Sequence, residues 1–158
     1  MTCWLPSKAA KTLALLCLIG WSCSPSESVV LRRSFSNNTW LYPDTLWGLI
    51  QVAEAPACYK LELHLYMEET YPWANLYLLF WIDTPEGFRE QRKIYIAFSD
   101  SIGQWYEENL HFRKVIGEQV HLGAKGMYRV GILPYIRQDT VVGVRRIELH
   151  TLRCPKGK

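Results

Sequence analysis

The chain has 158 residues, of which 49% are hydrophobic, with 18 basic and 15 acidic side chains and a formal charge of +3. This length and composition fit one globular domain that buries a sizeable core. They exclude nucleic acid as the expected partner, because a nucleic-acid-binding domain carries a basic stripe, whereas Arg145-Arg146 and 89–93 are only short basic clusters.

A short apolar segment near the N-terminus points to export. It runs from Leu13 to Ile19, follows Lys8 and Lys11, and leads into a segment rich in serine and proline. A helix that spans a bilayer needs about 20 apolar residues, so this segment is too short to cross one. A basic start, a short apolar stretch and small residues before a break are typical of a secretory signal peptide. We expect residues 1–22 to be removed; since they hold two lysines and no acid, 16 basic and 15 acidic residues remain.

The expected break point carries a cysteine. Gly20-Trp21-Ser22-Cys23 resembles a bacterial lipobox, in which signal peptidase cleaves before a cysteine that carries lipid on its sulfur. Several acyl chains, such as palmitate, anchor a protein stably, because each buried methylene contributes about 0.8 kcal/mol. The sequence predicts lipidation at Cys23, a lipidated and flexible polar tether over 23–38, and the folded domain over 39–158.

Strand patterns then follow one another along the chain, and no window shows helical periodicity of convincing length. Apolar and polar residues alternate at 59–67, 94–98, 128–132 and 147–151, and 76–82 is a continuous apolar run, with weaker patterns at 46–52 and 110–116. Turn-forming residues occupy 85–87, 99–103, 123–126 and 137–139. This pattern predicts an all-β fold: a single antiparallel β-sandwich, with a jelly roll as one version of it.

Two cysteines remain in the predicted domain, Cys58 and Cys154. They flank its regular part, and an exported protein can keep such a pair as a disulfide. We predict a disulfide between them, with two free thiols as the alternative. If 59–67 pairs antiparallel with 147–151 so that Cys58 faces Cys154, a register for the two strands follows.

The same register makes further matches along the two strands. It sets Glu62 opposite His150 and His64 opposite Glu148, with apolar pairs on the other face. Matched cross-strand pairs stabilise by about 0.2–1 kcal/mol each. The single mismatched pair is Met67 and Arg145.

Signatures of catalysis are absent from the sequence. It contains no G-x-S-x-G, H-E-x-x-H, C-x-x-C or glycine-rich phosphate motif. Ser99-Asp100-Ser101 lies in a predicted turn, where such side chains normally bond to the local backbone. We expect no enzymatic activity and no cofactor.

The four histidines are His64, His111, His121 and His150. None has a second ligand type at metal spacing, although His64 and His150 share a strand face in the register above. The expectation is solvated histidines without a metal; a zinc site on that face is the alternative.

Aromatic residues are abundant, with seven tryptophans and nine tyrosines. Exposed rings on a β-sandwich can stack on sugars, which makes Trp73, Trp105 and Tyr106 candidate glycan or protein contacts. The other interpretation, which we favour, is that large rings fill the core of a small sandwich and cover its hairpins.

Several segments are similar to a known family when taken in chain order. They are YKLEL (59–63), YPWANLYL (71–78), DTPEGF (83–88), DSIGQW (100–105), GMYRV (126–130) and VGVRRI (142–147). This set resembles the GldH gliding motility lipoprotein family of Bacteroidetes, and Trp40 with Asp44 matches its early W…D pattern. Two positions depart from the family: Tyr66 stands where arginine is usual, and 106–108 replaces a glycine-rich stretch.

The resemblance implies a non-catalytic lipoprotein of the outer membrane, facing the periplasm or the cell surface. Its partners would be the membrane, through the lipid anchor, and other envelope proteins of the gliding and type IX secretion machinery. The alternative function, taken from the aromatic residues alone, is a surface lipoprotein that binds glycans.

Overall fold

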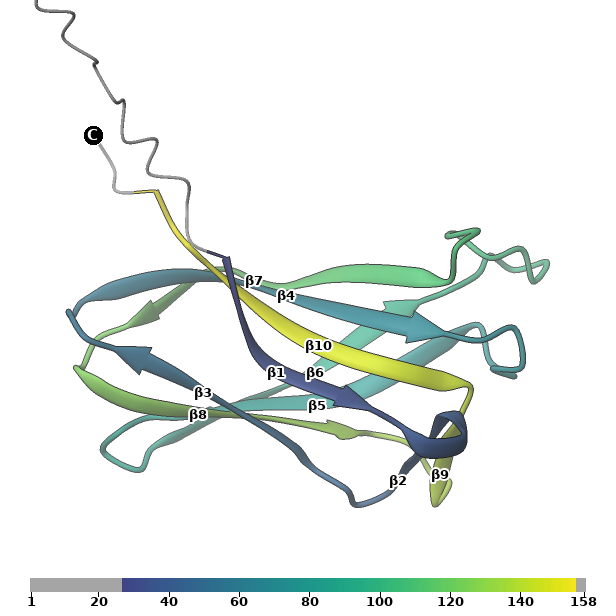
Figure 1. The fold of residues 1–158 in the computed structure, drawn as a ribbon, viewed down its shortest axis with the longest axis horizontal. Coiled ribbons are helices and arrows are strands. Elements are labelled where there is room, and N and C mark those ends of the chain that lie inside the picture. The colour runs from purple at the N-terminus through teal and green to yellow at the C-terminus, as the bar shows by residue number, and fades with distance from the viewer. Residues whose placement is uncertain (1–26, 156–158) are drawn as a thin grey trace, which may run out of the picture.

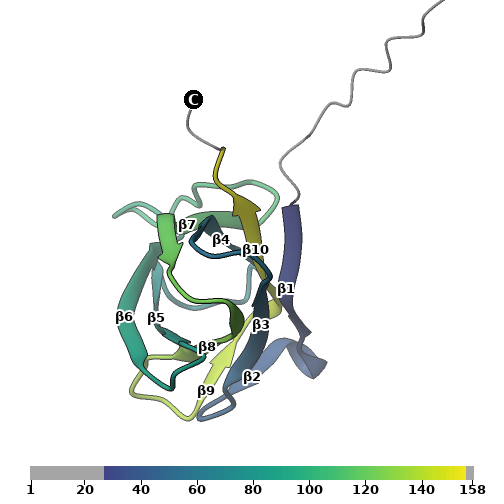
Figure 2. The same cartoon turned by 90° about the vertical axis from the view of Figure 1, so that its left-hand side faces the viewer.

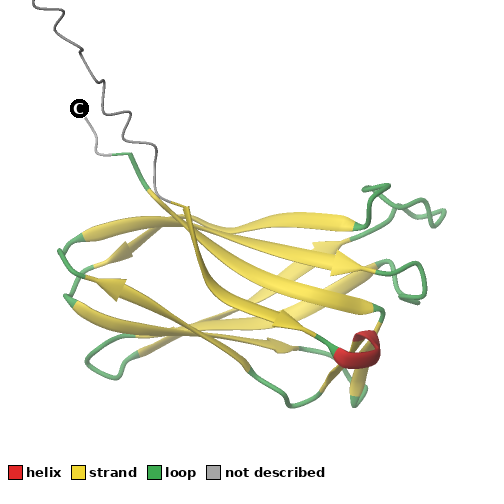
Figure 3. Ribbon diagram, in the orientation of Figure 1, coloured by secondary structure: helices red, strands yellow, loops and turns green. Residues whose placement is uncertain are grey.

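The computed structural model describes residues 27–155, which form an almost entirely β-stranded fold (Figure 1). The strands are β1 (Glu27–Ser34), β2 (Thr39–Leu41), β3 (Leu46–Val52), β4 (Ala57–Met67), β5 (Asn75–Asp83), β6 (Arg89–Ala97), β7 (His111–Leu122), β8 (Gly126–Pro134), β9 (Thr140–Val142) and β10 (Val144–Arg153). A short 3-10 turn, η1 (Ser36–Asn38), is the one helical element in the described part of the chain (Figure 3). Between residues 27 and 155, no helix has the length and apolar character needed to cross a bilayer. The predicted signal peptide and Cys23 lie outside the described residues.

Two four-stranded antiparallel sheets face each other (Figure 2). Their strand orders are β1-β10-β4-β7 and β3-β8-β5-β6, and β2 pairs with β9 in a separate short ribbon. Without the two short strands, the eight long ones are ordered 1-8-3-6 and 2-7-4-5, which is the arrangement of a jelly roll. The predicted all-β sandwich is thus confirmed, and the topology is the jelly-roll version.

Alternation along the strands supplies the core between the sheets. On β4, Leu61, Leu63 and Leu65 point inward with at most 1% of their surface exposed. The facing sheet contributes Leu78, Val130 and Ile132 among others, all similarly buried. Burial of this apolar surface is the main favourable term in folding, at about 25 cal/mol per Å².

The W…D motif has a structural role beside this core. Trp40 is fully buried, and its indole Nε1 donates a hydrogen bond of 2.7 Å to the backbone carbonyl of Asp44. A buried indole N–H needs such a partner. The motif therefore closes the turn between β2 and β3.

The pairing of β4 with β10 has the predicted register. Glu62 lies opposite His150 and His64 opposite Glu148. The predicted mismatch of Met67 with Arg145 does not occur, because a β-bulge shifts the register and Met67 pairs with Val144. The bulged Arg145 instead donates from Nε to the Met67 carbonyl at 2.9 Å.

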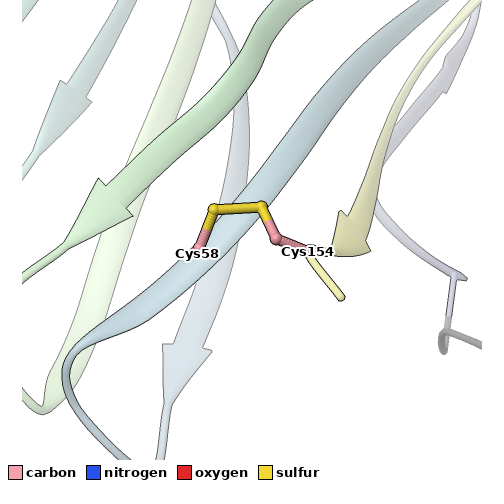
Figure 4. The surroundings of a disulfide bond; sticks show 2 residues. All are labelled: Cys58 and Cys154. Carbon is pink, nitrogen blue, oxygen red and sulfur yellow. A yellow bond between two sulfur atoms is a disulfide. The ribbon is translucent and has the colours of Figure 1, made fainter. Parts of the chain in front are cut away.

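Cys58 at the start of β4 and Cys154 just after β10 are joined by a disulfide (Figure 4). The backbone N–H of Cys154 also donates to the carbonyl of Cys58 at 2.9 Å, which continues the ladder by one step. The disulfide therefore fastens the central pair of strands at one end of the sandwich. We call this end, where β1 also begins, the disulfide end.

The folded domain begins earlier than the sequence predicts. Residues 27–34 were expected in the flexible tether, but they form β1, the edge strand beside β10. Only Leu31 of β1 is buried, and it belongs to the core cluster. The sequence of β1 shows no apolar alternation. β1 is therefore a strand because it pairs with β10, and its sequence pattern alone does not predict it.

Candidate functional site: a histidine–glutamate cluster and an aromatic cleft

A buried group of polar side chains lies on the outer face of the sheet β1-β10-β4-β7. Its centre is His64 on β4 with Glu148 and His150 on β10, which we call the His/Glu cluster. These residues alternate with core leucines, so they point away from the core. They are nevertheless only 8%, 3% and 9% exposed, because neighbouring side chains cover them. The expectation of solvated histidines at 64 and 150 is therefore wrong.

Carboxylates and a third histidine surround the two central rings. His150 lies 2.6 Å from Glu27 through Nδ1 and 2.9 Å from Glu148 through Nε2. The His64 and His150 rings are stacked, with centroids 4.0 Å apart and planes 10° apart.

His64 is placed in the same way between two polar partners. Its Nε2 lies 3.0 Å from Glu62, and its Nδ1 lies 3.3 Å from Nε2 of His111 on β7. Both central imidazoles are thus oriented by a partner at each nitrogen.

Arginines hold the far side of Glu148. Its Oε1 lies 2.8 Å from Arg32 Nε and 3.2 Å from Arg146 Nε, whereas its Oε2 faces His150. The guanidinium of Arg146 also lies over the ring of Tyr66, 3.9 Å from its centroid. A buried carboxylate is tolerated only with such partners.

The pKa values in the cluster follow from burial and these contacts. Burial lowers the pKa of His64 below its usual value. The hydrogen bond and the negative charge of Glu62 raise this pKa, but they offset the effect of burial only in part. Burial likewise lowers the pKa of His111. Burial alone would raise the pKa of Glu148, but the His150 hydrogen bond and the two arginines hold it below its usual value. His64 and His111 are therefore favoured as neutral imidazoles, close to a Glu148 carboxylate that is ionised at neutral pH.

A cleft lined by aromatic rings lies at the opposite end of the sandwich from the disulfide. Its volume is about 570 Å³, within the range of ligand pockets. Trp73, Tyr77 and Tyr135 line it and are 53%, 44% and 48% exposed. We call it the aromatic cleft, and the end formed by the connections 68–74, 98–110 and 135–139 the aromatic end (Figure 1).

The three predicted contact residues have different surroundings. Trp73 lines the aromatic cleft, and Tyr106 is 59% exposed on the 98–110 connection. Trp105 instead packs on the core, with its ring 5.9 Å from Phe112 and 6.3 Å from Phe98. The sequence did not predict that Tyr77 and Tyr135 would join Trp73, because they come from different strand ends.

The turn containing Ser99-Asp100-Ser101 is structural. Asp100 Oδ1 accepts hydrogen bonds of 2.9 Å from the backbone N–H groups of Ile102 and Gln104. The local bonding that the sequence predicts for this turn is thus confirmed.

An antiparallel jelly roll with a binding-sized cleft at one end and a disulfide at the other defines a small β-sandwich domain. The chain belongs to the GldH lipoprotein family, whose model matches residues 31–150. The resemblance to GldH is thereby confirmed, and membership indicates a membrane-anchored envelope protein.

No curated protein matches the chain. Among solved structures, a Podospora anserina GH26-CBM35 beta-(1,4)-mannanase is 12% identical with a TM-score of 0.45, and the match covers 84% of this chain. The chain spans 28% of the length of that enzyme.

Proposed function

We propose that this protein is a non-catalytic outer-membrane lipoprotein of the gliding motility and type IX secretion-associated envelope machinery. The observation that supports it most is the family match over residues 31–150. In this proposal Cys23 carries the lipid, and the sandwich is a scaffold that contacts neighbouring proteins of the machinery.

The position of β1 supports a role in which the anchor sets the location of the domain. Only three residues, 24–26, separate Cys23 from the start of β1 at Glu27. Four backbone steps span at most about 14 Å. The disulfide end would thus stay close to the membrane, and the aromatic end would be available to partners.

The exposed aromatic residues Trp73 and Tyr106 are the proposed partner contacts at the aromatic end. Aromatic side chains dominate the energetics of many protein interfaces, because each buries a large area. Edge strands β1 and β7 offer additional unpaired backbone groups for contact.

Affinity purification from native membranes tests this function. The tagged, lipidated wild-type chain is expected to enrich gliding or type IX secretion proteins. The double variant W73A/Y106A is expected to lose most of that enrichment. F88A is the matched control, because Phe88 is 74% exposed but lies in the β5–β6 hairpin at the disulfide end. Equal enrichment by all three chains would exclude these contacts, and no enrichment of such proteins would overturn the proposal.

Glycan binding in the aromatic cleft is the second candidate function. Three exposed rings around one cleft form the kind of surface on which sugars stack. A glycan-array screen of the full chain tests this second function. Any glycan that binds is then tested with the variants W73A and F88A. Binding that W73A abolishes and F88A retains supports a glycan-binding protein, and an array without hits argues against it.

A further inference from the structure

We propose that His64, His150 and Glu148 bind a divalent transition-metal ion, and that zinc fits these donors best. One ligand atom from each residue lies within 4.8 Å of the others, and all three residues are buried. A tetrahedral zinc site has ligand atoms about 3.3–3.5 Å apart, because zinc lies about 2.0–2.2 Å from each. The most widely spaced donors therefore need to close by at most about 1.5 Å to reach coordination spacing, whereas Glu148 Oε2 and His150 Nε2, 2.9 Å apart, need to open slightly.

Glu148 is already placed as a ligand with an outer shell. Its Oε2 lies 2.9 Å from His150 Nε2, where a metal would replace the shared proton. Its Oε1 is held by Arg32 and Arg146 and would remain so after binding. These two contacts are ion pairs, and ligating carboxylates are generally fixed by partners outside the metal site.

His64 has to turn before it can bind. Its ring is stacked on His150, and two parallel rings cannot both direct an in-plane lone pair at one ion. The Cβ–Cγ torsion of histidine is intrinsically broad, so the turn costs mainly the contacts that the ring makes with Glu62 and His111. Before the turn, Nε2 of His64 lies 3.0 Å from the Glu62 carboxylate, a partner of the kind that orients ligating histidines, so binding through Nδ1 would need the least rearrangement on that side.

The charge around the cluster selects the kind of ion. The carboxylates of Glu27, Glu62 and Glu148 are offset by the cations of Arg32, Lys60 and Arg146. Calcium and magnesium depend on several oxygen ligands and on negative charge. Imidazole nitrogen suits zinc and copper, so the cluster is expected to prefer zinc over calcium.

Entry of the ion is available from the edge of the sheet. Arg32 and Glu27 on the edge strand β1 cover the cluster, and their side chains are 61% and 51% exposed. Long exposed side chains change rotamer readily, on the picosecond to nanosecond timescale. The ion would therefore reach the cluster without unfolding of a strand.

Calorimetric titration of the full chain in detergent with zinc chloride tests the proposal. Free thiols are first alkylated, which removes competing cysteine ligands. We expect one saturable site per chain with micromolar or tighter affinity, at least tenfold weaker binding in H64N and in H150N, and no comparable binding of calcium. H121N is the matched control, because His121 is an exposed histidine on β7, and its affinity should equal that of the wild type.

A second measurement on the wild type keeps the test independent of variant folding. Zinc should shift the imidazole NMR resonances of His64 and His150 and leave those of His121 in place. The absence of saturable binding at about 100 µM zinc would overturn the proposal and leave a hydrogen-bonded network. Undiminished binding in the H64N/H150N double variant, or shifts confined to His121, would overturn it as well.

Discussion

Gly131 on β8 shows how a missing side chain creates space for a large one. A Cβ at this position would lie 2.3 Å from Cε2 of the Trp81 indole. That indole is 5% exposed and meets Trp47 edge-to-face, with centroids 5.2 Å apart. The glycine therefore determines where the Trp81 ring can lie.

Replacement of Gly131 by alanine is expected to destabilise the fold by about 1–3 kcal/mol, the usual cost of overpacking. Urea denaturation measures this loss as a lower midpoint. G123A is the control, because a Cβ at Gly123 meets no atom within 4 Å. Equal midpoints for the two variants would show that Trp81 moves without cost.

Asp83 at the end of β5 predicts a dependence of stability on pH. Arg89 donates to it from Nε at 2.6 Å and Nη2 at 3.0 Å, and Arg129 from Nη2 at 2.9 Å. The hydrogen bond from Arg89 is the main reason that the pKa of Asp83 lies below its usual value. Because the folded pKa is lower than the unfolded one, the ionised carboxylate stabilises the fold above pH ~3.9, and this contribution disappears as the pH falls through the folded pKa.

The substitution D83N should therefore lower the free energy of unfolding by about 1 kcal/mol at pH 7, as expected for a largely surface ion pair. At about pH 3 the difference from the wild type should shrink, because protonation removes the same charge. E86Q, in the exposed turn of the same hairpin, is the control. A difference that stays constant from pH 7 to pH 3 would contradict the role of the ionised carboxylate.

At the level of elements, strands with a buried face could be predicted and strands without one could not. The pattern at 46–52 coincides with β3, and the alternation at 59–67 lies within β4. β1 has a single buried residue, and β2 and β9 have three residues each, so partner strands define them. A bulge was needed at Arg145, and the mismatch with Met67 was its only sign in the sequence.

The candidate sites divide in the same way. The predicted register placed His64 and His150 on one face of the sheet. It could be predicted because the pairing of their two strands follows from the charge and polarity of the side chains. Glu27 and His111 reach the cluster through β1 and β7, whose pairings the sequence did not reveal. The aromatic cleft depends on connections from three parts of the chain. Local periodicity carries no information about which connections lie close together in the fold.

The Cys58–Cys154 disulfide makes a prediction for the central strand pair. It closes a loop between residues 96 positions apart, and such a link stabilises mainly by restricting the unfolded chain. The variant C58A/C154A should lose about 2–4 kcal/mol of stability by urea denaturation. Reduced wild-type protein should match the variant, whereas an unchanged midpoint in both would show that the β4–β10 ladder suffices.

At the scale of the whole molecule, the two ends of the sandwich have different properties. The disulfide end holds the start of β1 and the junction of Cys58 with Cys154. The aromatic end holds the long connections and the cleft with Trp73, Tyr77 and Tyr135. β4 alone has 11 residues, so the ends are about 33 Å apart. A lipid on Cys23 would thus separate an anchored end from a contact end.

This arrangement predicts how the lipidated chain stands on a membrane. The three residues between Cys23 and Glu27 reach about 14 Å, much less than the length of β4, so only the disulfide end is held at the lipid. A fluorophore at E54C, in the β3–β4 connection of that end, should transfer energy to a membrane dye more efficiently than one at I102C. Ile102 is 84% exposed in the 98–110 connection of the aromatic end. A control chain with a long Gly/Ser insertion after Ser24 should lose the difference, because its domain tumbles freely. Equal transfer from the two sites in the unmodified chain would mean that the sandwich lies flat, and the aromatic end would then have no privileged access to partners.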